Sequence, residues 1–179
     1  MKKDYLVFFF VLMNTIFFGC STKVKVEKQS VQRKLNKNTV IDLPTVLKFT
    51  MVKTADGKKV YKIKADKAVV DDKNKIITVY NGEAKVYDKK MQIASLKFEV
   101  AKYDIVSEDI YFLGKNIINT IEKEKIITYD IKYLYKENKI FSDKEIEIYK
   151  DNNIVKGIGF ETFDGFQTIK IYKNVITTE

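Results

Sequence analysis

The chain has 179 residues, a net charge of +9, one cysteine, and neither histidine nor tryptophan. This length suits a single ordinary domain. Without histidine there is no Ser-His or Cys-His nucleophile and no histidine-ligated metal, and one cysteine cannot form an internal disulfide. An enzyme would have to work with Asp, Glu, Lys, Tyr or Ser alone. We therefore expect a protein that is not an enzyme and that holds no cofactor and no metal.

The positive charge is unevenly distributed. Of the 33 basic residues only Arg33 is arginine, the residue best suited to bidentate contacts with phosphates and guanines. Residues 21–43 carry six basic and two acidic side chains, whereas residues 45–179 carry 25 lysines and 21 acids. Interleaved signs in the longer segment indicate solvated outer faces, so we expect no nucleic-acid partner.

Residues 1–19 are typical of an export signal. Two lysines precede an apolar run at residues 5–18, which ends at Gly19 and Cys20. Fourteen positions are few for a membrane span, which needs roughly 20. The segment resembles a bacterial lipoprotein signal, in which the cysteine becomes the lipid anchor, although Phe17-Phe18 departs from the usual residues. The alternative is a short, uncleaved N-terminal anchor. Both place the rest of the chain outside the cytoplasm.

Residues 20–44 are expected to form a polar, basic tether. They lack the apolar periodicity of a helix or strand. If Cys20 is acylated, the folded part contains no thiol. The basic side chains could lie against anionic headgroups, or the segment could be only a spacer. The folded domain is then expected at residues 45–179.

From Thr45 onward, apolar and polar residues alternate as in half-buried antiparallel strands. Leu47, Phe49 and Met51 are expected on one face of the first strand, and no stretch shows a helical stripe. Further alternating sets lie at Tyr61/Ile63/Ala65, Ala84/Val86, Ala94/Leu96/Phe98/Val100, Ile131/Tyr133/Tyr135, Ile146/Ile148 and Ile169/Ile171. Turn-like residues separate them at 55–57, 72–74, 81–82, 88–90, 136–138, 151–153 and 164–165. This spacing predicts an all-β meander, sandwich or open roll.

A weak internal repeat supports that interpretation. Ala84, Ile117, Ile146 and Val175 can be superposed as apolar anchors, each preceded by a turn and an earlier apolar strand. A period near 30 residues suggests one hairpin per unit, stacked so that neighbours bury a shared face. The alternative is that any meander rich in Lys and Ile aligns with itself this well.

Several runs resemble the LptC family in their order and spacing. They are residues 43–50, residues 56–68, and a C-terminal set at 141–149, 154–160 and 169–175, which includes the Gly-x-Gly of Gly157 and Gly159. Members of this family are periplasmic components of lipopolysaccharide export. They sit on the inner-membrane transporter of LptB, LptF and LptG and pass lipopolysaccharide to LptA. The resemblance therefore implies a periplasmic protein anchored to the inner membrane.

The resemblance also implies an open antiparallel β-jellyroll whose apolar interior takes acyl chains. Such a groove needs one apolar wall on each strand, which the alternation supplies. Each of these side chains could instead only pack in the core. The candidates for the lipid-binding groove are Phe49, Ile63, Val86, Phe98, Tyr133, Ile146, Ile148, Ile169 and Ile171.

Both ends of an open roll are expected to accept a strand from another chain. By resemblance, the edge near Leu47 and Met51 would join LptF and LptG, and the edge that contains Val175 would join LptA. Gly157 and Gly159 fit such a site, since a strand glycine allows close backbone approach, or they form a simple kink. Members of the family typically keep a transmembrane helix, which a lipid anchor at Cys20 would replace.

Three other functions compete with lipopolysaccharide transport. The nearest is a stand-alone lipoprotein of related fold that binds another lipid, followed by a surface lipoprotein for adhesion or structure. A glycosidase with paired carboxylates is weaker, because Asp71-Asp72 and Glu122/Glu124 are turn-like and no tryptophan is present to hold a sugar.

Overall fold

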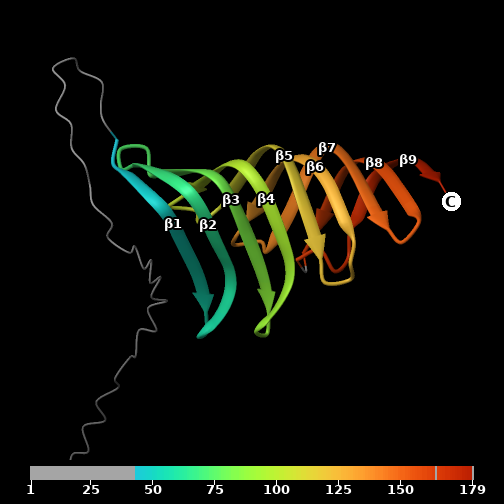
Figure 1. Ribbon diagram of the computed structural model, residues 1–179, viewed down its shortest axis with the longest axis horizontal. Coiled ribbons are helices and arrows are strands. Elements are labelled where there is room, and N and C mark those ends of the chain that lie inside the picture. Colours follow the sequence, from blue (N-terminus) through green and yellow to red (C-terminus); the bar gives the residue numbers. More distant parts are fainter. Residues whose placement is uncertain (1–42, 164, 179) are drawn as a thin grey trace, which may run out of the picture.

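The computed structural model describes residues 43–163 and 165–178, with side chains as far as residue 174. Cys20, the expected signal and nearly all of the expected tether lie outside the described residues. Nine antiparallel strands form one sheet in chain order (Figure 1). They are β1 (Thr45–Ala55), β2 (Lys58–Asp71), β3 (Ile76–Asp88), β4 (Met91–Asp104), β5 (Ile110–Thr120), β6 (Lys125–Leu134), β7 (Lys139–Lys150), β8 (Asn153–Thr162) and β9 (Lys170–Thr178).

The prediction of an all-β fold with an open antiparallel sheet is confirmed. The described residues contain no helix, so none there is long and apolar enough to span a membrane. Turns follow β1, β2, β3, β6 and β7 where the sequence predicted them. The predicted turn at Asn81-Gly82 is wrong, because both residues lie inside β3, where Gly82 pairs with Ala65 of β2 and Phe98 of β4.

The strands bend along a corner line that crosses the sheet. At this line the backbone is left-handed, with φ of 51° at Lys48, 51° at Asn81, 72° at Gly114, 48° at Asp130 and 71° at Gly159. The ladders from β4 to β8 shift register at the same level. Irregular residues of this kind bend a strand and increase its twist.

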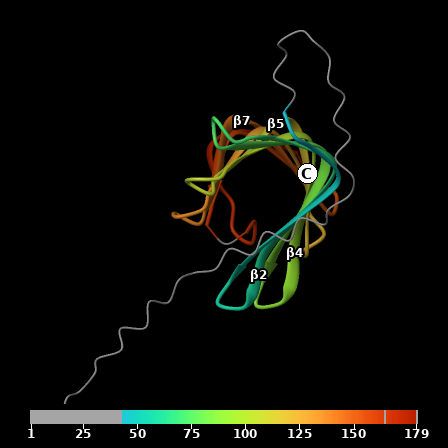
Figure 2. The ribbon, with the colours of Figure 1, turned by 90° about the vertical axis from the view of Figure 1, so that its left-hand side faces the viewer.

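The corner line divides the sheet into two walls. Wall A consists of the strand halves on the side of the corner line that carries the β1–β2, β3–β4, β5–β6 and β7–β8 turns. Wall B holds the parts that lead to the other turns. Viewed along the strand order, the sheet curls round on itself (Figure 2), and the inner faces of the two walls meet.

The corner line also decides which residues face inward. The prediction that Leu47 shares a face with Phe49 and Met51 is wrong. Leu47 is 61% exposed, while Phe49 and Met51 are 4% and 3% exposed. The left-handed Lys48 lies between them and reverses the alternation of the strand.

Buried polar side chains satisfy backbone groups that the corner leaves without ladder partners. Thr128 Oγ1 donates to the Glu145 carbonyl oxygen at 2.8 Å, and Ser142 Oγ donates to the Tyr129 carbonyl oxygen at 2.7 Å. Asn116 Nδ2 donates to a carbonyl oxygen of its own strand at 2.9 Å. Because a buried carbonyl group without a hydrogen-bond partner costs free energy, these side chains lower the free-energy cost of the bend.

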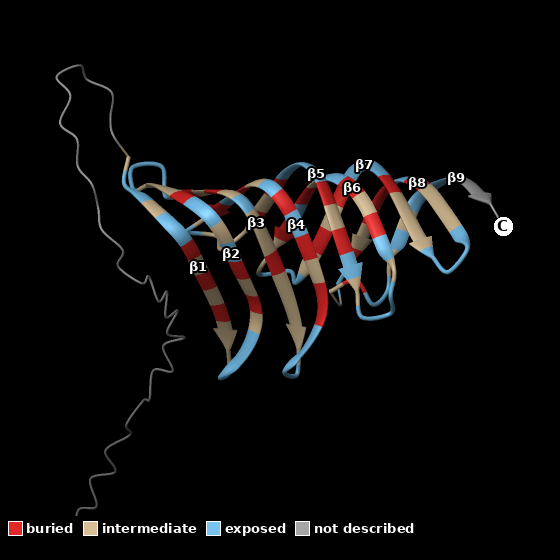
Figure 3. Ribbon diagram, in the orientation of Figure 1, coloured by how far each residue is buried: buried red, intermediate tan, exposed pale blue. Residues whose placement is uncertain are grey.

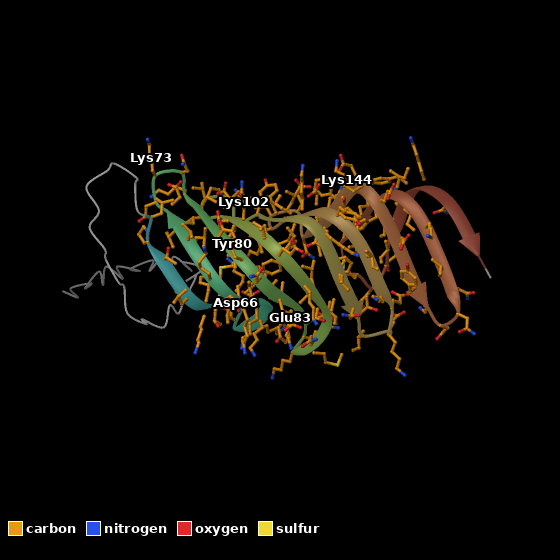
Figure 4. The ribbon with its side chains drawn as sticks, turned by 45° about the horizontal axis from the view of Figure 1, so that its top comes forward. Asp66, Lys73, Tyr80, Glu83, Lys102 and Lys144 are labelled. Atoms are coloured by element: carbon orange, nitrogen blue, oxygen red, sulfur yellow. The ribbon has the colours of Figure 1, made fainter. Side chains whose placement is uncertain are left out.

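The inner faces of both walls share one apolar core, visible as the buried bands in Figure 3. Charged side chains on the outer surface, such as Lys73 and Lys144, reach away from the roll (Figure 4). The most completely buried apolar residues, at 1% exposure or less, are Ile63, Ala68, Val79, Ala101, Ile118, Ile126, Ile131, Ile146 and Phe160.

Candidate functional site

A cavity of about 440 Å³ lies inside the roll, between wall A of β2–β4 and wall B of β5–β7. This volume falls within the range of roughly 300–1,000 Å³ typical of small-molecule sites. Aliphatic and aromatic side chains dominate its lining, so it suits an apolar ligand. They include Val60, Tyr61, Ile63, Ala84, Val86, Ile93, Leu96, Ile110, Phe112, Tyr133, Ile140, Phe163 and Phe166.

The cavity brings together three of the candidate groove residues, Ile63, Val86 and Tyr133. The other candidates lie in the core around it rather than in its lining. Phe49, Phe98 and Ile146 are buried, and Ile148, Ile169 and Ile171 are half-buried and pack against the buried cluster.

Aromatic rings join the walls at one end of the cavity. Tyr61 of β2 packs edge-on against Tyr133 of β6, with ring centroids 6.0 Å apart. Burial raises the pKa of Tyr61 and, together with the nearby Tyr135, raises the pKa of Tyr133 to about 12. Both hydroxyls therefore stay neutral at physiological pH.

The segment between β8 and β9 closes another part of the roll. Phe166 is 3% exposed and packs near Phe160, with ring centroids 6.4 Å apart. A Cβ added to Gly165 would touch Ile93 and lie 3.2 Å from Val86, both on wall A. This segment therefore crosses from wall B to wall A and covers the cavity.

An ion pair joins the walls near the first edge of the sheet. Lys53 of β1 is 3% exposed, and its Nζ lies 2.7 Å from Glu108 Oε1 and 4.3 Å from the centre of the Tyr135 ring. Burial lowers the pKa of Lys53, but hydrogen bonds and charges from Glu108 and Tyr135 outweigh that effect and raise it. Lys53 therefore stays charged inside the roll.

Lys53, Glu108 and Phe166 were not among the site residues predicted from the sequence. Lys53 was detectable, because it continues the period-2 alternation of Phe49 and Met51 toward the interior. Glu108 and Phe166 lie between strands, where no periodicity assigns an inward side.

Strands β1 and β9 each pair on one side only within the described sheet. Leu47 lies on the β1 edge and is exposed, whereas Met51 on the same strand points into the core. Val175 lies on β9, where only the backbone is described.

Gly157 and Gly159, predicted at the partner edge, lie one strand further in, on β8, which pairs with both β7 and β9. A Cβ on Gly157 would touch Ile171 and lie 2.8 Å from the Lys173 carbonyl oxygen. A Cβ on Gly159 would lie 2.7 Å from a ring carbon of Tyr172. The strand that approaches these glycines closely is therefore this chain's own β9.

A cluster around Glu161 attaches the last edge strand. Its carboxylate accepts from Lys139 at 2.7 Å, from the Tyr172 hydroxyl at 2.9 Å and from Lys170 at 3.2 Å. These contacts, with Lys139 the strongest, lower the pKa of Glu161 to about 2. The cluster therefore links β7, β8 and β9 at neutral pH. No group of three or more potential metal-binding side chains occurs in the part of the chain that the structure describes.

Two comparisons relate the chain to known proteins. The structure of LptH from Pseudomonas aeruginosa, described as the LptA-homologous periplasmic component of the lipopolysaccharide transport device, is similar to this chain. It is 15% identical, with 63% of this chain and 82% of that chain covered and a TM-score of 0.47. No curated protein sequence matches the chain. The family model for lipopolysaccharide assembly, LptC-related, matches residues 5–179. The chain therefore belongs to the LptC family of lipopolysaccharide-assembly proteins.

Proposed function

We propose that the chain is a membrane-anchored periplasmic component of lipopolysaccharide export. It accepts lipopolysaccharide from the inner-membrane transporter of LptB, LptF and LptG and passes it to LptA. Cys20, as a lipid anchor, holds it at the inner membrane. The protein binds and transfers its cargo without chemical conversion, so no catalytic group is assigned.

The observation that carries this proposal is the apolar cavity inside an open roll. Acyl chains gain roughly 0.8 kcal/mol for each methylene that leaves water, and Ile63, Val86 and Tyr133 offer such a surface. The interior lies between two bent walls, so a chain can slide along it without breaking the backbone hydrogen bonds of the sheet.

The two unpaired edges support head-to-tail assembly. Exposed strand edges accept a strand from another protein, which extends the sheet and its interior together. In this proposal, the β1 edge at Leu47 joins LptF and LptG, and the β9 edge near Val175 joins LptA. Lipid then moves from one roll to the next without crossing water.

Photocrosslinking in cells tests the cargo. A benzophenone amino acid at Ile63 faces the cavity, whereas one at Lys64 lies next to it on the exposed face of β2. Capture of lipopolysaccharide at position 63 but not at 64, during active export, is expected. Absence of capture at position 63 and at other cavity positions, with normal protein levels, would refute lipopolysaccharide carriage. Capture of phospholipid alone would favour the stand-alone lipid-binding lipoprotein.

The same method tests the partners and the anchor. A crosslinker at Leu47 is expected to capture LptF or LptG, and one at the exposed Lys173 of β9 is expected to capture LptA. Crosslinks in the reverse assignment would contradict the proposed polarity. Replacement of Cys20 by Ala should prevent acylation, and an unchanged mass and membrane fraction would instead favour an uncleaved anchor.

A further inference from the structure

The ion pair between Lys53 and Glu108 joins parts of the roll that the sheet does not join. Lys53 lies on β1, and Glu108 lies in the turn between β4 and β5, so β2, β3 and β4 separate them in the sheet. Their 2.7 Å contact therefore crosses the interior from the margin of wall A to the margin of wall B. It closes the roll near the edge where lipid enters in the proposed function.

This pair is poorly explained as a simple stabiliser. A buried ion pair often costs as much in desolvation as it gains in attraction, and an apolar pair of similar size would hold the walls as well. The Lys53 side chain is 4% exposed, whereas that of Glu108 is 22% exposed. The lysine is thus fixed inside, and the carboxylate lies close enough to solvent to turn outward.

Hydrogen bonds within the turn fix the backbone just before Glu108. Asp104 Oδ1 accepts hydrogen bonds from the amides of Val106 at 2.8 Å and Ser107 at 3.0 Å. Glu108 itself has a φ of 66°, a conformation that costs energy for a residue with a side chain.

The charge of the domain favours an anionic ligand at this end. Residues 43–104, which form β1–β4, contain 14 lysines and eight acidic residues, a net charge of +6. Residues 105–179 contain 11 lysines and 13 acidic residues, a net charge of −2. A field of this polarity attracts negative headgroups to the end of the roll that contains Lys53.

We propose that Lys53 is an anion-binding residue for the phosphate group of an entering acyl lipid, which replaces Glu108 as its partner and so releases the two walls. This inference rests on the proposed function, because it assumes that acyl chains enter the cavity. Glu108 acts as an internal substitute for the phosphate. It keeps the lysine paired and the roll closed until a ligand with a negative headgroup arrives.

A competition experiment tests the proposal. The full chain, in a non-ionic detergent, is given an equimolar mixture of lipid A and its dephosphorylated form, and native mass spectrometry reports the ratio of the two bound lipids. A second mixture of phosphatidic acid and diacylglycerol distinguishes a phospholipid phosphate from a glycolipid phosphate. Dependence on Lys53 in either mixture supports the proposal and identifies the source.

The wild-type chain should favour the phosphate-bearing lipid by about tenfold or more, as one charge-assisted hydrogen bond allows. Lys53→Met should bring the ratio near one while neutral lipid still binds. Lys53→Arg should keep the preference, and Glu108→Gln should increase it. Lys150→Met is the matched control, because Lys150 pairs with Glu124 at 2.9 Å outside the roll; its ratio should equal that of the wild type.

The outcomes separate the two proposals. If the wild-type chain binds neither lipid, the proposed function fails. If it binds both with a ratio near one, or if Lys53→Met keeps the wild-type ratio, only the role of Lys53 is overturned. Should Lys53→Met fail to fold, the double variant Lys53→Met/Glu108→Leu replaces the pair by apolar groups, and a retained preference in that variant would equally overturn the proposal.

Discussion

Filling the cavity should block lipid binding without disturbing the fold. Ala84 is 4% exposed and lines the cavity from β3. Ala84→Phe would place a ring there. A ring needs a space of roughly 100–150 Å³, since a cavity of about 150 Å³ engineered in another protein holds benzene. This is between about a quarter and a third of the 440 Å³ available.

The loss of affinity follows from the apolar surface that the ligand can no longer bury. A ring of that size excludes roughly four or five methylenes, each of which contributes about 0.8 kcal/mol. The expected cost is about 3–4 kcal/mol, which weakens binding roughly 100- to 1,000-fold. Folding should be little affected, because the ring occupies space that is already empty.

The assay is photocrosslinking of lipopolysaccharide from position 63 in the Ala84→Phe background. Ser95→Phe is the control, because Ser95 lies on β4 between the buried Ala94 and Leu96 and so faces outward. Capture should fall sharply in the first variant and remain unchanged in the second. Equal capture by Ala84→Phe and the wild type, at equal protein level and melting temperature, would show that lipid does not use this cavity.

Three further predictions concern the corner and the last strand. Thr128→Val keeps the shape of the side chain but removes its hydrogen bond to the Glu145 carbonyl oxygen, so the free energy of unfolding in urea should fall by about 1–3 kcal/mol. The pKa of Glu161 is lowered to about 2 in the folded protein, against about 4.3 in the unfolded chain. The ionised carboxylate therefore stabilises β9 fully at any pH above about 4.3. This stabilisation should disappear as the pH falls from that value toward 2, which amide exchange in β9 measures. Gly157→Ala should crowd the Lys173 carbonyl oxygen, loosen β9 and weaken LptA crosslinking, while lipid capture at position 63 persists.

Each of these predictions has a matched control. Thr50→Val, at a half-buried position of β1, should change stability little, and an equal loss in both threonine variants would contradict the role of the corner hydrogen bond. Glu161→Gln should remove the acid dependence of β9 exchange; persistence of that dependence would assign it to another group. For Gly157→Ala, unchanged amide exchange in β9 would show that the strand does not need the glycine.

The sequence predicted the strands well because alternation is a local property. The repeat near 30 residues corresponds to the structure in part, since its anchors fall on every second strand, β3, β5, β7 and β9. The earlier strand that was expected before each anchor is wrong for β3, β5 and β7, where it is the first half of the same bent strand. Its anchor in β5 is off by one residue. Ile118, at 0% exposure, occupies the inward row of Ala84 and Leu96, whereas Ile117 is half-buried.

The errors share one physical cause, which is the corner line. Asn-Gly favours left-handed backbone both in a turn and in a bend within a strand, so Asn81-Gly82 is ambiguous from sequence. The bend is decided by the strands on either side, which are far away in the chain. A left-handed lysine at position 48 has no sequence signal at all, and it reversed the expected face of Leu47.

The same corner line explains how an open sheet can hold a ligand. A closed barrel would need backbone hydrogen bonds to separate before lipid could enter from the side or leave at an end. Here the described ladder joins only strands that follow each other in sequence, and the walls meet through side chains such as the Lys53–Glu108 and Tyr61–Tyr133 pairs. Opening therefore costs side-chain contacts rather than ladder hydrogen bonds. Contacts of that kind can be exchanged for contacts with a ligand, whereas unpaired backbone groups inside an apolar cavity could not.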